Sequence, residues 1–210
     1  MLHLDPFYPI APDTEWLVRL LAQGIKLVQL RIKDQGTEFV RAEIDKAIAL
    51  CAEHRCQLVI NDYWREAADA GADFVHLGQE DLAAADLVAI RTAGIKIGIS
   101  THCEQELEKA LRANADYVAL GPIYATKLKK MPWAPQGLAR LTEWRARIKC
   151  PLVAIGGITP ERAPVVLEAG ADSAAVITDI LTDQAPEQRI RTWISVTKPW
   201  RHLSTEFPQS

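Results

Sequence analysis

The phrase AGADFVHLG at Ala70–Gly78 returns as ANADYVALG at Ala113–Gly121 and as AGADSAAVI at Ala169–Ile177. Each copy contains the residues expected at a helix end, then a Gly or Asn that stops the helix, an Asp, and a short apolar run typical of a buried strand. Such self-similarity indicates one βα unit that is used several times. The phrase therefore predicts a parallel α/β fold.

The same alternation continues along the whole chain. Apolar runs predict eight strands, at Tyr8–Ala11, Leu27–Ile32, Leu58–Asn61, Phe74–Leu77, Lys96–Ser100, Tyr117–Leu120, Leu152–Ile155 and Ala174–Ile177. Helical patterns lie between them, for example at Glu38–Ala52, Cys103–Arg112, Leu138–Ile148 and Pro160–Ala169. Eight such units close into a (β/α)8 TIM barrel, so residues 1–210 are predicted to form one barrel domain with short loops. The alternative is an open doubly wound sheet, but no GxGxxG follows the first predicted strand.

Composition excludes several classes of protein. Of 210 residues, 49% are hydrophobic and 24% are charged, which is ordinary for a globular domain and excludes disordered, collagen-like and coiled-coil chains. The net charge of −3 provides no basic field for nucleic acid. No apolar run approaches the ~18 residues of a membrane span, and the N-terminal sequence does not resemble a signal peptide. We therefore expect a cytoplasmic protein without nucleic-acid or membrane partners.

Polar and apolar side chains alternate at the second predicted strand. The run VQLRIK at residues 28–33 places Gln29, Arg31 and Lys33 on one face, because successive side chains of a strand point to opposite sides. Two cations in a barrel mouth are unfavourable unless an anion meets them. Arg offers parallel donors to phosphate oxygens and Lys offers a point charge. A structural ion-pair network with acidic neighbours explains the same pattern equally well.

Acidic side chains follow the next two predicted strands. Asp62 comes directly after Asn61, and Asp81 lies shortly after the fourth strand. In a barrel these strand ends share one face, where the chemistry of the fold takes place. Carboxylates there can hold Mg²⁺, which commonly shares its ligands with substrate phosphates. Taken singly, each Asp is better explained as a helix N-cap; beside Arg31 and Lys33, the pair indicates a metal–pyrophosphate site.

Further polar segments follow the fifth and sixth strands. Ser100 ends the fifth strand, where its hydroxyl can donate to a phosphate or a heterocycle. His76, within the fourth strand, is better explained as a hydrogen-bonded interior residue than as a base. The segment of residues 122–137 contains the longest insert and carries three Lys in its middle. We predict that it is a mobile lid bringing cations to a phosphate, against the alternative of a solvated charge run.

Two glycines follow the seventh predicted strand. Gly156 and Gly157 allow backbone N–H groups to approach an anion, and the loops after strands seven and eight are the frequent phosphate site of this fold. With the metal site, this indicates two phosphorylated substrates or one substrate phosphorylated at both ends. No Ser or Cys has the paired base of a nucleophilic mechanism. Departure of a metal-bound pyrophosphate would require none.

The segments QLRIKD, NDYWREA, VHLGQEDL, GISTH, LGPIYATK, APQGL, AIGGIT and AGADS follow one another in the order in which a known family carries them. Through them the chain resembles the thiamine-phosphate synthases (thiamine-phosphate pyrophosphorylases) over nearly its whole length. The resemblance implies a (β/α)8 barrel that joins 4-amino-2-methyl-5-(diphosphooxymethyl)pyrimidine to 4-methyl-5-(2-phosphoethyl)thiazole or its carboxylated form. It also implies that Mg²⁺ is required, and that the products are thiamine phosphate and pyrophosphate.

The resemblance also implies a role for individual residues. Asp62 and Asp81 would bind Mg²⁺. The implied contacts to the pyrimidine diphosphate are Gln29, Arg31, Lys33, Asn61, Ser100 and Lys129, among which Arg31, Lys33, Ser100 and Lys129 would be catalytic. The implied contacts to the thiazole phosphate are Thr126, Leu128, Gly157, Ile177 and Thr178. The family usually has Thr where this chain has Leu128 and often Pro where it has Ala125, so part of the lid contact differs.

The implied chemistry needs charge stabilisation rather than a base. An electron-rich aminopyrimidine can expel pyrophosphate and leave a cation, which the thiazole nitrogen captures.

Two alternative functions remain. A thiazole tautomerase of similar fold would need a His base and no diphosphate site, which the set of Asp62, Asp81, Arg31 and Lys33 disfavours. The other alternative is a non-catalytic binder of thiamine phosphates. Leu128 gives it slight support, because one contact of the lid is lost. The expected partners are two small phosphorylated heterocycles, and a homo-oligomer is left open.

Overall fold

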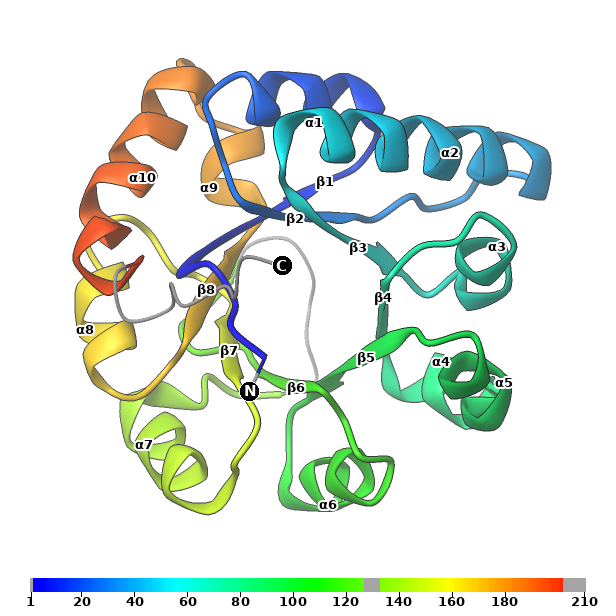
Figure 1. The fold of residues 1–210 in the computed structure, drawn as a ribbon. Coiled ribbons are helices and arrows are strands. Elements are labelled where there is room, and N and C mark those ends of the chain that lie inside the picture. The colour runs from blue at the N-terminus through cyan, green and yellow to red at the C-terminus, as the bar shows by residue number, and fades with distance from the viewer. Residues whose placement is uncertain (1, 127–132, 202–210) are drawn as a thin grey trace, which may run out of the picture.

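The computed structural model describes residues 2–126 and 133–201, and their strands form a closed parallel barrel (Figure 1). The strands are β1 (Phe7–Ala11), β2 (Leu27–Leu30), β3 (Gln57–Asn61), β4 (Phe74–Leu77), β5 (Lys96–Thr101), β6 (Tyr117–Leu120), β7 (Leu152–Ile155) and β8 (Ser173–Val176). Each strand pairs in parallel with the next, and β8 pairs with β1, where Phe7 lies opposite Ala174. The (β/α)8 prediction is confirmed, and the open doubly wound sheet is excluded because the sheet has no free edge.

The largest difference from the predicted strands is at the end of β2. The predicted strand runs to Ile32, whereas β2 ends at Leu30, the last residue that pairs with both neighbours, Ala11 and Ile60. Beyond this point the alternation continues without strand pairing, since Ile32 is buried in the core whereas Arg31 and Lys33 are exposed. Arg31 and Lys33 consequently lie in the β2–α2 connection, at the carboxyl end of the barrel.

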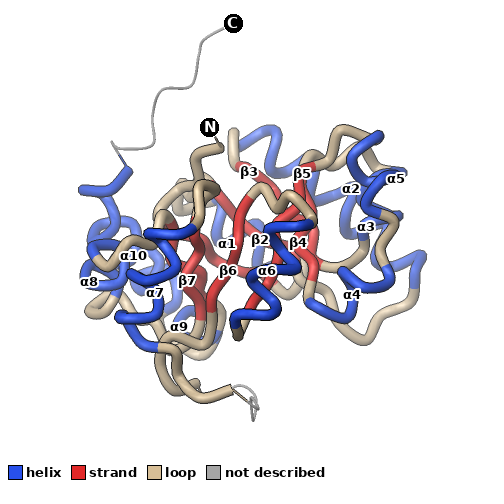
Figure 2. The backbone as a smooth tube through the Cα atoms, turned by 90° about the horizontal axis from the view of Figure 1, so that it is seen from below, coloured by secondary structure: helices blue, strands red, loops and turns tan. Residues whose placement is uncertain are grey.

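Helices surround the ring of strands (Figures 1 and 2). They are α1 (Thr14–Leu21), α2 (Thr37–His54), α3 (Trp64–Asp69), α4 (Gln79–Ala84), α5 (Leu87–Thr92), α6 (Glu104–Arg112), α7 (Gly137–Arg147), α8 (Ala163–Glu168), α9 (Thr178–Leu181) and α10 (Pro186–Arg201). The four predicted helices are present as α2, α6, α7 and α8, although α8 begins three residues after the predicted Pro160. Within residues 2–126 and 133–201, no helix has both the length and the apolar character needed to cross a membrane.

Apolar side chains fill the layer between strands and helices. Val28 and Leu30 of β2 belong to one buried cluster with Val40 and Ile44 of α2, and the cluster continues around the barrel. Every second residue of β2 faces this layer, which is the arrangement predicted for the apolar face of the run at residues 28–33. The layer holds each helix against its strands and thereby fixes the connections that carry the site.

In two of its three copies, the Asp of the repeated phrase connects its βα unit to the preceding strand. In the second copy, Asp116 accepts a hydrogen bond from the backbone N–H of Ile97 in β5 at 2.8 Å and pairs with Arg91 at 2.5 Å. In the third copy, Asp172 accepts one from the first residue of β7 at 2.7 Å and pairs with Arg145 at 2.6 Å. The Asp therefore has a structural reason to recur, since it satisfies a backbone donor at the amino end of the barrel.

A second buried cluster fills the barrel itself. It consists of side chains that point toward the barrel axis, namely Leu4, Tyr8, Ile10, Leu27, Val59, Phe74, Tyr117, Ala119, Val153 and Ala175. Gly98 makes room for one of them, because a Cβ at this position would lie 2.1 Å from the ring of Tyr117. The barrel is thus a packed core rather than a channel, and a substrate has to bind at its end.

Candidate active site

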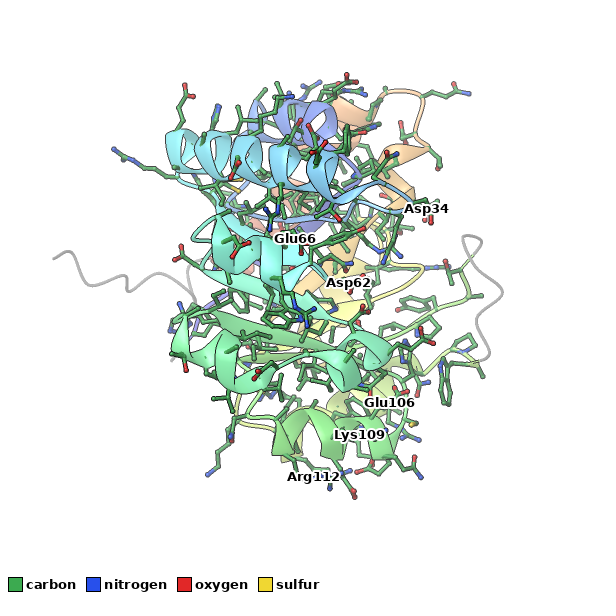
Figure 3. The ribbon with its side chains drawn as sticks, turned by 90° about the vertical axis from the view of Figure 1, so that its right-hand side faces the viewer. Asp34, Asp62, Glu66, Glu106, Lys109 and Arg112 are labelled. Carbon is green, nitrogen blue, oxygen red and sulfur yellow. The ribbon has the colours of Figure 1, made fainter. Side chains whose placement is uncertain are left out.

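A cavity of about 350 Å³ lies at the carboxyl ends of the first half of the barrel. Lys33 lines it from the β2–α2 connection, Asp62 from the end of β3, and Asp81 from α4. Figure 3 looks onto this part of the molecule and labels Asp62 together with Asp34 and Glu66 around it. Side chains from three successive βα units therefore meet in one cavity.

Asp62 is held by two donors. Lys33 Nζ and Asn61 Nδ2 each lie 2.5 Å from its Oδ2. The backbone of Asp62 has a φ of 68°, in the left-handed region that Asp tolerates better than most residues. The N-cap position of α3 is Tyr63, and it makes no side-chain capping bond. The explanation of Asp62 as a helix cap is therefore wrong, because its carboxylate is engaged by Lys33 and Asn61 instead.

Asp81 faces Asp62 from the first turn of α4. Burial raises the pKa of the Asp81 carboxyl, and the charge of Asp62 and a hydrogen bond with it raise this pKa further, while Lys33 opposes the shift. Gly78 leaves space for this arrangement, since a Cβ there would lie 3.1 Å from Asp81 Oδ2. The ammonium group of Lys33 thus acts on both carboxylates.

Three carboxylates line this cavity, those of Asp62, Asp81 and Glu66, and among them Asp62 and Asp81 are close enough to share a hydrogen bond. In the described part of the chain, no group of three or more His, Cys, Asp and Glu side chains gathers where it could hold a metal ion. A cation between Asp62 and Asp81 would therefore take its remaining ligands from water or from a substrate. This is the ligand pattern of Mg²⁺ sites that are completed by substrate phosphates.

Gln29 and Arg31, which the sequence placed on one polar face with Lys33, lie in different surroundings. Gln29 is buried inside the barrel and donates from Nε2 to the Tyr8 hydroxyl at 3.0 Å. Arg31 is exposed, and its backbone N–H donates to Ala11 O at 2.8 Å. The pKa of His76 is lowered mainly by burial and also by the charge of Arg31, so Arg31 lies within electrostatic reach of the barrel interior. Arg31 remains available to an anion, whereas Gln29 belongs to the core.

Ser100 lies at the end of a row of buried hydrogen bonds. The Tyr8 and Tyr117 hydroxyls are 3.1 Å apart, His76 Nδ1 is 2.7 Å from the Tyr117 hydroxyl, and His76 Nε2 is 2.7 Å from Ser100 Oγ. Burial lowers the pKa of His76 to about 4, although the charge of Asp62 opposes the shift. The prediction that His76 is a hydrogen-bonded interior residue is confirmed, and its ring is neutral at neutral pH.

The predicted glycine turn packs against the β6–α7 connection. Gly156 and Gly157 have φ values of 100° and 64°. A Cβ on Gly157 would lie 2.6 Å from Ala125 O, and one on Gly156 would lie 2.7 Å from Pro122 Cα. The Tyr124 N–H also donates to Gly156 O at 3.0 Å. Glycine is therefore required for the close approach of two connections, a reason that does not depend on anion binding.

Ile177 is the N-cap of α9 and Thr178 is its first residue, and ion pairs fix the position of this short helix after β8. Asp179, which follows them, pairs with Arg189 of α10 at 2.7 Å. Arg189 also pairs with Glu161 of the β7–α8 connection at 3.0 Å. One arginine therefore holds both connections of the predicted phosphate site against the same helix.

The predicted lid of residues 122–137 falls only partly within the described residues. Thr126 is the last described residue before the gap, and Leu128 and Lys129 lie outside the described residues. After the gap, the ring of Trp133 stacks on His102 with centroids 5.7 Å apart. The end of the segment that leads into α7 is thus in contact with the end of β5.

A family model described as thiamine monophosphate synthase matches residues 7–180. The chain belongs to the thiamine monophosphate synthase family. It is 61% identical to the thiamine-phosphate synthase of Rhizobium etli over 203 residues, which covers 96% of this chain and 100% of that relative. It is 49% identical to the thiamine-phosphate synthase of Pectobacterium atrosepticum, with 88% and 87% covered. A solved thiamine phosphate pyrophosphorylase from Pyrococcus furiosus has a TM-score of 0.83 at 27% identity, covering 93% of this chain and 96% of that one.

In this member of the thiamine monophosphate synthase family, the predicted site residues fall into two groups. Lys33, Asn61, Asp62 and Asp81 gather at the ends of β2, β3 and β4. Strands β7 and β8 lie across the ring from β3 and β4 in Figure 1, and Gly157, Ile177 and Thr178 follow these two strands in the chain. The residues of the two anion sites expected from the sequence thus lie on opposite sides of one barrel mouth.

Three residues of this family member were not singled out from the sequence. Tyr8 and Tyr117 read as apolar strand residues, yet their hydroxyls join a polar row across the barrel. They are 109 residues apart in the chain, so no local pattern relates them. Arg189 lies on a helix in which charged residues are common, and only its ion pairs with Glu161 and Asp179 show that it holds two segments together. The signal for all three is a contact between distant elements.

Proposed function

We propose that this chain condenses 4-amino-2-methyl-5-(diphosphooxymethyl)pyrimidine with 4-methyl-5-(2-phosphoethyl)thiazole, or with its carboxylated form, to give thiamine phosphate and pyrophosphate. Family membership supports the proposal. The observation that carries it is geometric: Asp62 and Asp81 face each other beside Lys33 in one cavity at the strand ends. Two carboxylates and a cation in this arrangement suit a diphosphate that arrives with a metal ion.

Mg²⁺ is the proposed cofactor, and Asp62 and Asp81 would hold it. Both are hard oxygen ligands, and the pKa of Asp81 is raised first by burial and then by the neighbouring charge of Asp62. A divalent cation would remove the repulsion between the two carboxylates, so the residues present fit the ion. When bound, Mg²⁺ would neutralise negative charge on the diphosphate and make it a better leaving group.

The side chains around the cavity act on the diphosphate as it departs. Lys33 is 45% exposed and pairs with Asp62, so its ammonium group can also reach an incoming phosphate. Arg31 is exposed and offers two parallel N–H donors. Negative charge grows on the diphosphate while its bond to the pyrimidine methylene carbon breaks. Donors at this position therefore stabilise the transition state more than the ground state.

Further contacts to the pyrimidine diphosphate are proposed for Gln29, Asn61, Ser100 and Lys129. Ser100 and Asn61 lie at the ends of β5 and β3, next to the cavity residues. Gln29 is buried, so its contribution is to the row of hydrogen bonds beneath the substrate. Lys129 lies outside the described residues, and its role as a second cation on the leaving group rests on the family resemblance.

The thiazole phosphate is proposed to bind on the opposite side of the mouth. Backbone groups of Gly157, Ile177 and Thr178 would hold its phosphate, with Thr126 and Leu128 at the lid. Both connections are fixed through Arg189, which keeps their backbone groups in place for the ligand. The thiazole nitrogen then attacks the pyrimidine methylene carbon with its own lone pair, so no base is needed and proximity supplies much of the rate.

The proposed partners and location follow from the substrates. Two small phosphorylated heterocycles carry several negative charges, and such molecules do not cross a membrane unaided. We therefore place the reaction in the cytoplasm, with Mg²⁺ available there. A net charge of −3 argues against a nucleic-acid partner.

The decisive experiment incubates the purified protein with both substrates and Mg²⁺ and measures pyrophosphate and thiamine phosphate. Product that requires both substrates and is lost with a chelator supports the proposal. Conversion of the carboxylated thiazole alone, with no pyrophosphate released, identifies a tautomerase instead. A rise in the unfolding temperature with thiamine phosphate, but without turnover, identifies a binding protein.

A further inference from the structure

A row of hydrogen bonds crosses the barrel interior and ends at its mouth. It begins at Gln29 of β2 and passes through Tyr8, Tyr117 and His76 to the hydroxyl of Ser100. The successive distances are 3.0, 3.1, 2.7 and 2.7 Å. All members except Ser100 are buried, so each proton in the row needs an acceptor within the row.

The core around the row is built to hold it. The ring of Tyr117 occupies the space that a side chain at Gly98 would fill. The His76 ring stacks on the Tyr117 ring with centroids 5.5 Å apart and an angle of 17° between the planes. Phe74 packs against the same Tyr117 ring at 5.4 Å. These contacts leave the two rings little freedom to turn and so fix the positions of their polar atoms.

The donors and acceptors of the row can be arranged in one direction. Gln29 Nε2 is a donor only, so the Tyr8 oxygen accepts from it. Among the described residues, the Tyr8 hydroxyl has one other hydrogen-bonding partner, Tyr117, which must therefore accept the Tyr8 proton. The reverse order would leave that proton buried without an acceptor, which is unfavourable. The amide of Gln29 also reaches the Tyr117 hydroxyl, but it donates there and so partly offsets the rise that burial causes in the pKa of Tyr117. Tyr117 must then donate its own proton to His76 Nδ1.

The direction of the row determines the tautomer of His76. Because Nδ1 accepts, the neutral ring carries its proton on Nε2. Nε2–H donates to Ser100 Oγ at 2.7 Å, which occupies that oxygen as an acceptor. The Ser100 carbonyl is held separately by Gln79 Nε2 at 2.7 Å. The hydroxyl proton of Ser100 is consequently directed away from the row and toward the half-buried end of β5.

We infer that Tyr117 and His76 are positioning residues that present the Ser100 hydroxyl as a hydrogen-bond donor to an acceptor atom of the substrate. A diphosphate gains negative charge as it leaves, so a donor oriented in advance is useful there while an oxygen lone pair is not. The identity of the substrate rests on the proposed function, whereas the order of protons within the barrel does not.

The tautomer of His76 tests the inference without any substrate. Nitrogen-15 NMR of His-labelled protein at pH 7, assigned with a His76→Gln variant, distinguishes a protonated Nε2 from a protonated Nδ1. The expected result is a protonated Nε2 and an accepting Nδ1 in the wild type. Tyr117→Phe removes the donor to Nδ1 and is expected to abolish this preference, whereas Tyr63→Phe is expected to leave it unchanged. A wild-type ring protonated on Nδ1 overturns the inference.

Kinetics of matched variants test the consequence for Ser100. The amide of His76→Gln can take the place of Nε2 and donate to Ser100, whereas the shorter His76→Asn reaches only the position of Nδ1. We expect His76→Gln to keep kcat within about threefold of wild type and His76→Asn to lose roughly tenfold, the effect of one hydrogen bond to a charged group. Thermal unfolding of each variant verifies that it is folded.

A double-mutant cycle separates positioning from a structural effect. If His76 acts through Ser100, His76→Asn combined with Ser100→Ala loses no more kcat than Ser100→Ala alone. Independent losses that multiply would overturn the inference. Absence of synthase activity in the wild type would refute the proposed function instead, and the NMR result would still decide the order of protons.

Discussion

A carboxylate at the end of a barrel strand can cap the following helix or bind a cation, and its immediate neighbours decide between the two. Asp62 is in a left-handed backbone conformation with Lys33 and Asn61 on one of its oxygens, and Asp81 faces it. The sequence provided the candidates but not this choice, because residue type and position fit both roles. The decisive evidence is a contact between residues from successive βα units.

Asp62→Asn and Asp81→Asn are each expected to reduce kcat/KM by about 100-fold or more, because an amide keeps the shape of the carboxyl group and loses the charge that a metal ion needs. Their effects on stability should differ in sign. Asp62→Asn loses the pairing with Lys33, whereas Asp81→Asn removes a charge that the fold disfavours. Steady-state kinetics at several Mg²⁺ concentrations and thermal unfolding measure both effects.

The control for these two variants is Asp69→Asn, whose carboxylate pairs with Arg41 on an exposed surface. It should change neither activity nor unfolding temperature appreciably. Full turnover of Asp62→Asn or Asp81→Asn at trace Mg²⁺ would contradict the metal site.

Arg31→Lys is expected to lower kcat/KM at least tenfold although the charge is kept. The guanidinium offers two parallel donors to a diphosphate, and an ammonium group cannot reproduce this geometry. Since Arg31 is exposed and lies beyond the last ladder pair of β2, the unfolding temperature should stay unchanged. An unchanged kcat/KM would show that Arg31 has no role on the leaving group.

Stability is expected to depend on pH through His76. Its pKa is about 4 in the folded protein against an ordinary value of 6.5, so between these values the unfolded chain binds a proton that the folded protein does not. Lowering the pH from 7 to 5 should therefore reduce the free energy of unfolding by about 2 kcal/mol through this group. Urea denaturation of wild type and His76→Gln at both pH values measures it. Equal losses in the two proteins would rule out His76 as the source.

Local sequence patterns predicted which secondary structure elements exist more accurately than they predicted where these elements end. The apolar runs located all eight strands, because a strand buried on both faces needs such a run. The end of β2 was placed two residues late, since the alternation of side chains continues past Leu30 while the pairing with β1 and β3 does not. Periodicity reports which side chains can face the core, and only the partner strand determines where a ladder stops.

The recurring Asp gives an element-level prediction. Asp172→Ala removes the pairing with Arg145 and leaves the first backbone N–H of β7 without its acceptor, so it should reduce the free energy of unfolding by about 1–3 kcal/mol. Activity at a temperature where the variant is folded should be unchanged, because these contacts lie at the amino end of the barrel. Denaturant unfolding and steady-state kinetics test both statements.

A suitable comparison for Asp172→Ala is Asp69→Ala. Its ion pair with Arg41 joins two exposed side chains and involves no backbone donor of a strand. A loss below about 1 kcal/mol is expected for this variant. Equal losses at the two positions would mean that the repeated Asp has no special structural role.

For the molecule as a whole, the eight alternating βα patterns, supported by the repeated phrase, were sufficient to predict the architecture, and polar residues at the strand ends led to two separate anion sites, which stay a prediction. Eight similar βα units have one common way to satisfy all strand edges, which is to close, and closure places every strand end on one face. The row from Gln29 to Ser100 could not be predicted, because it joins five strands whose side chains meet only at the barrel axis. Interior polar networks depend on packing in three dimensions and leave no periodic trace in the sequence.

The pairing of β1 with β8 also has a consequence for folding during synthesis on the ribosome. The contact between Phe7 and Ala174 joins residues about 170 positions apart, so the first strand leaves the ribosome long before its second neighbour exists. At ~5–20 residues per second, one edge of β1 waits roughly 10–30 s for its partner. An open parallel edge is a template for the strands of other nascent chains. A pause in translation before β8 should therefore increase aggregation far more than a pause of equal length after it.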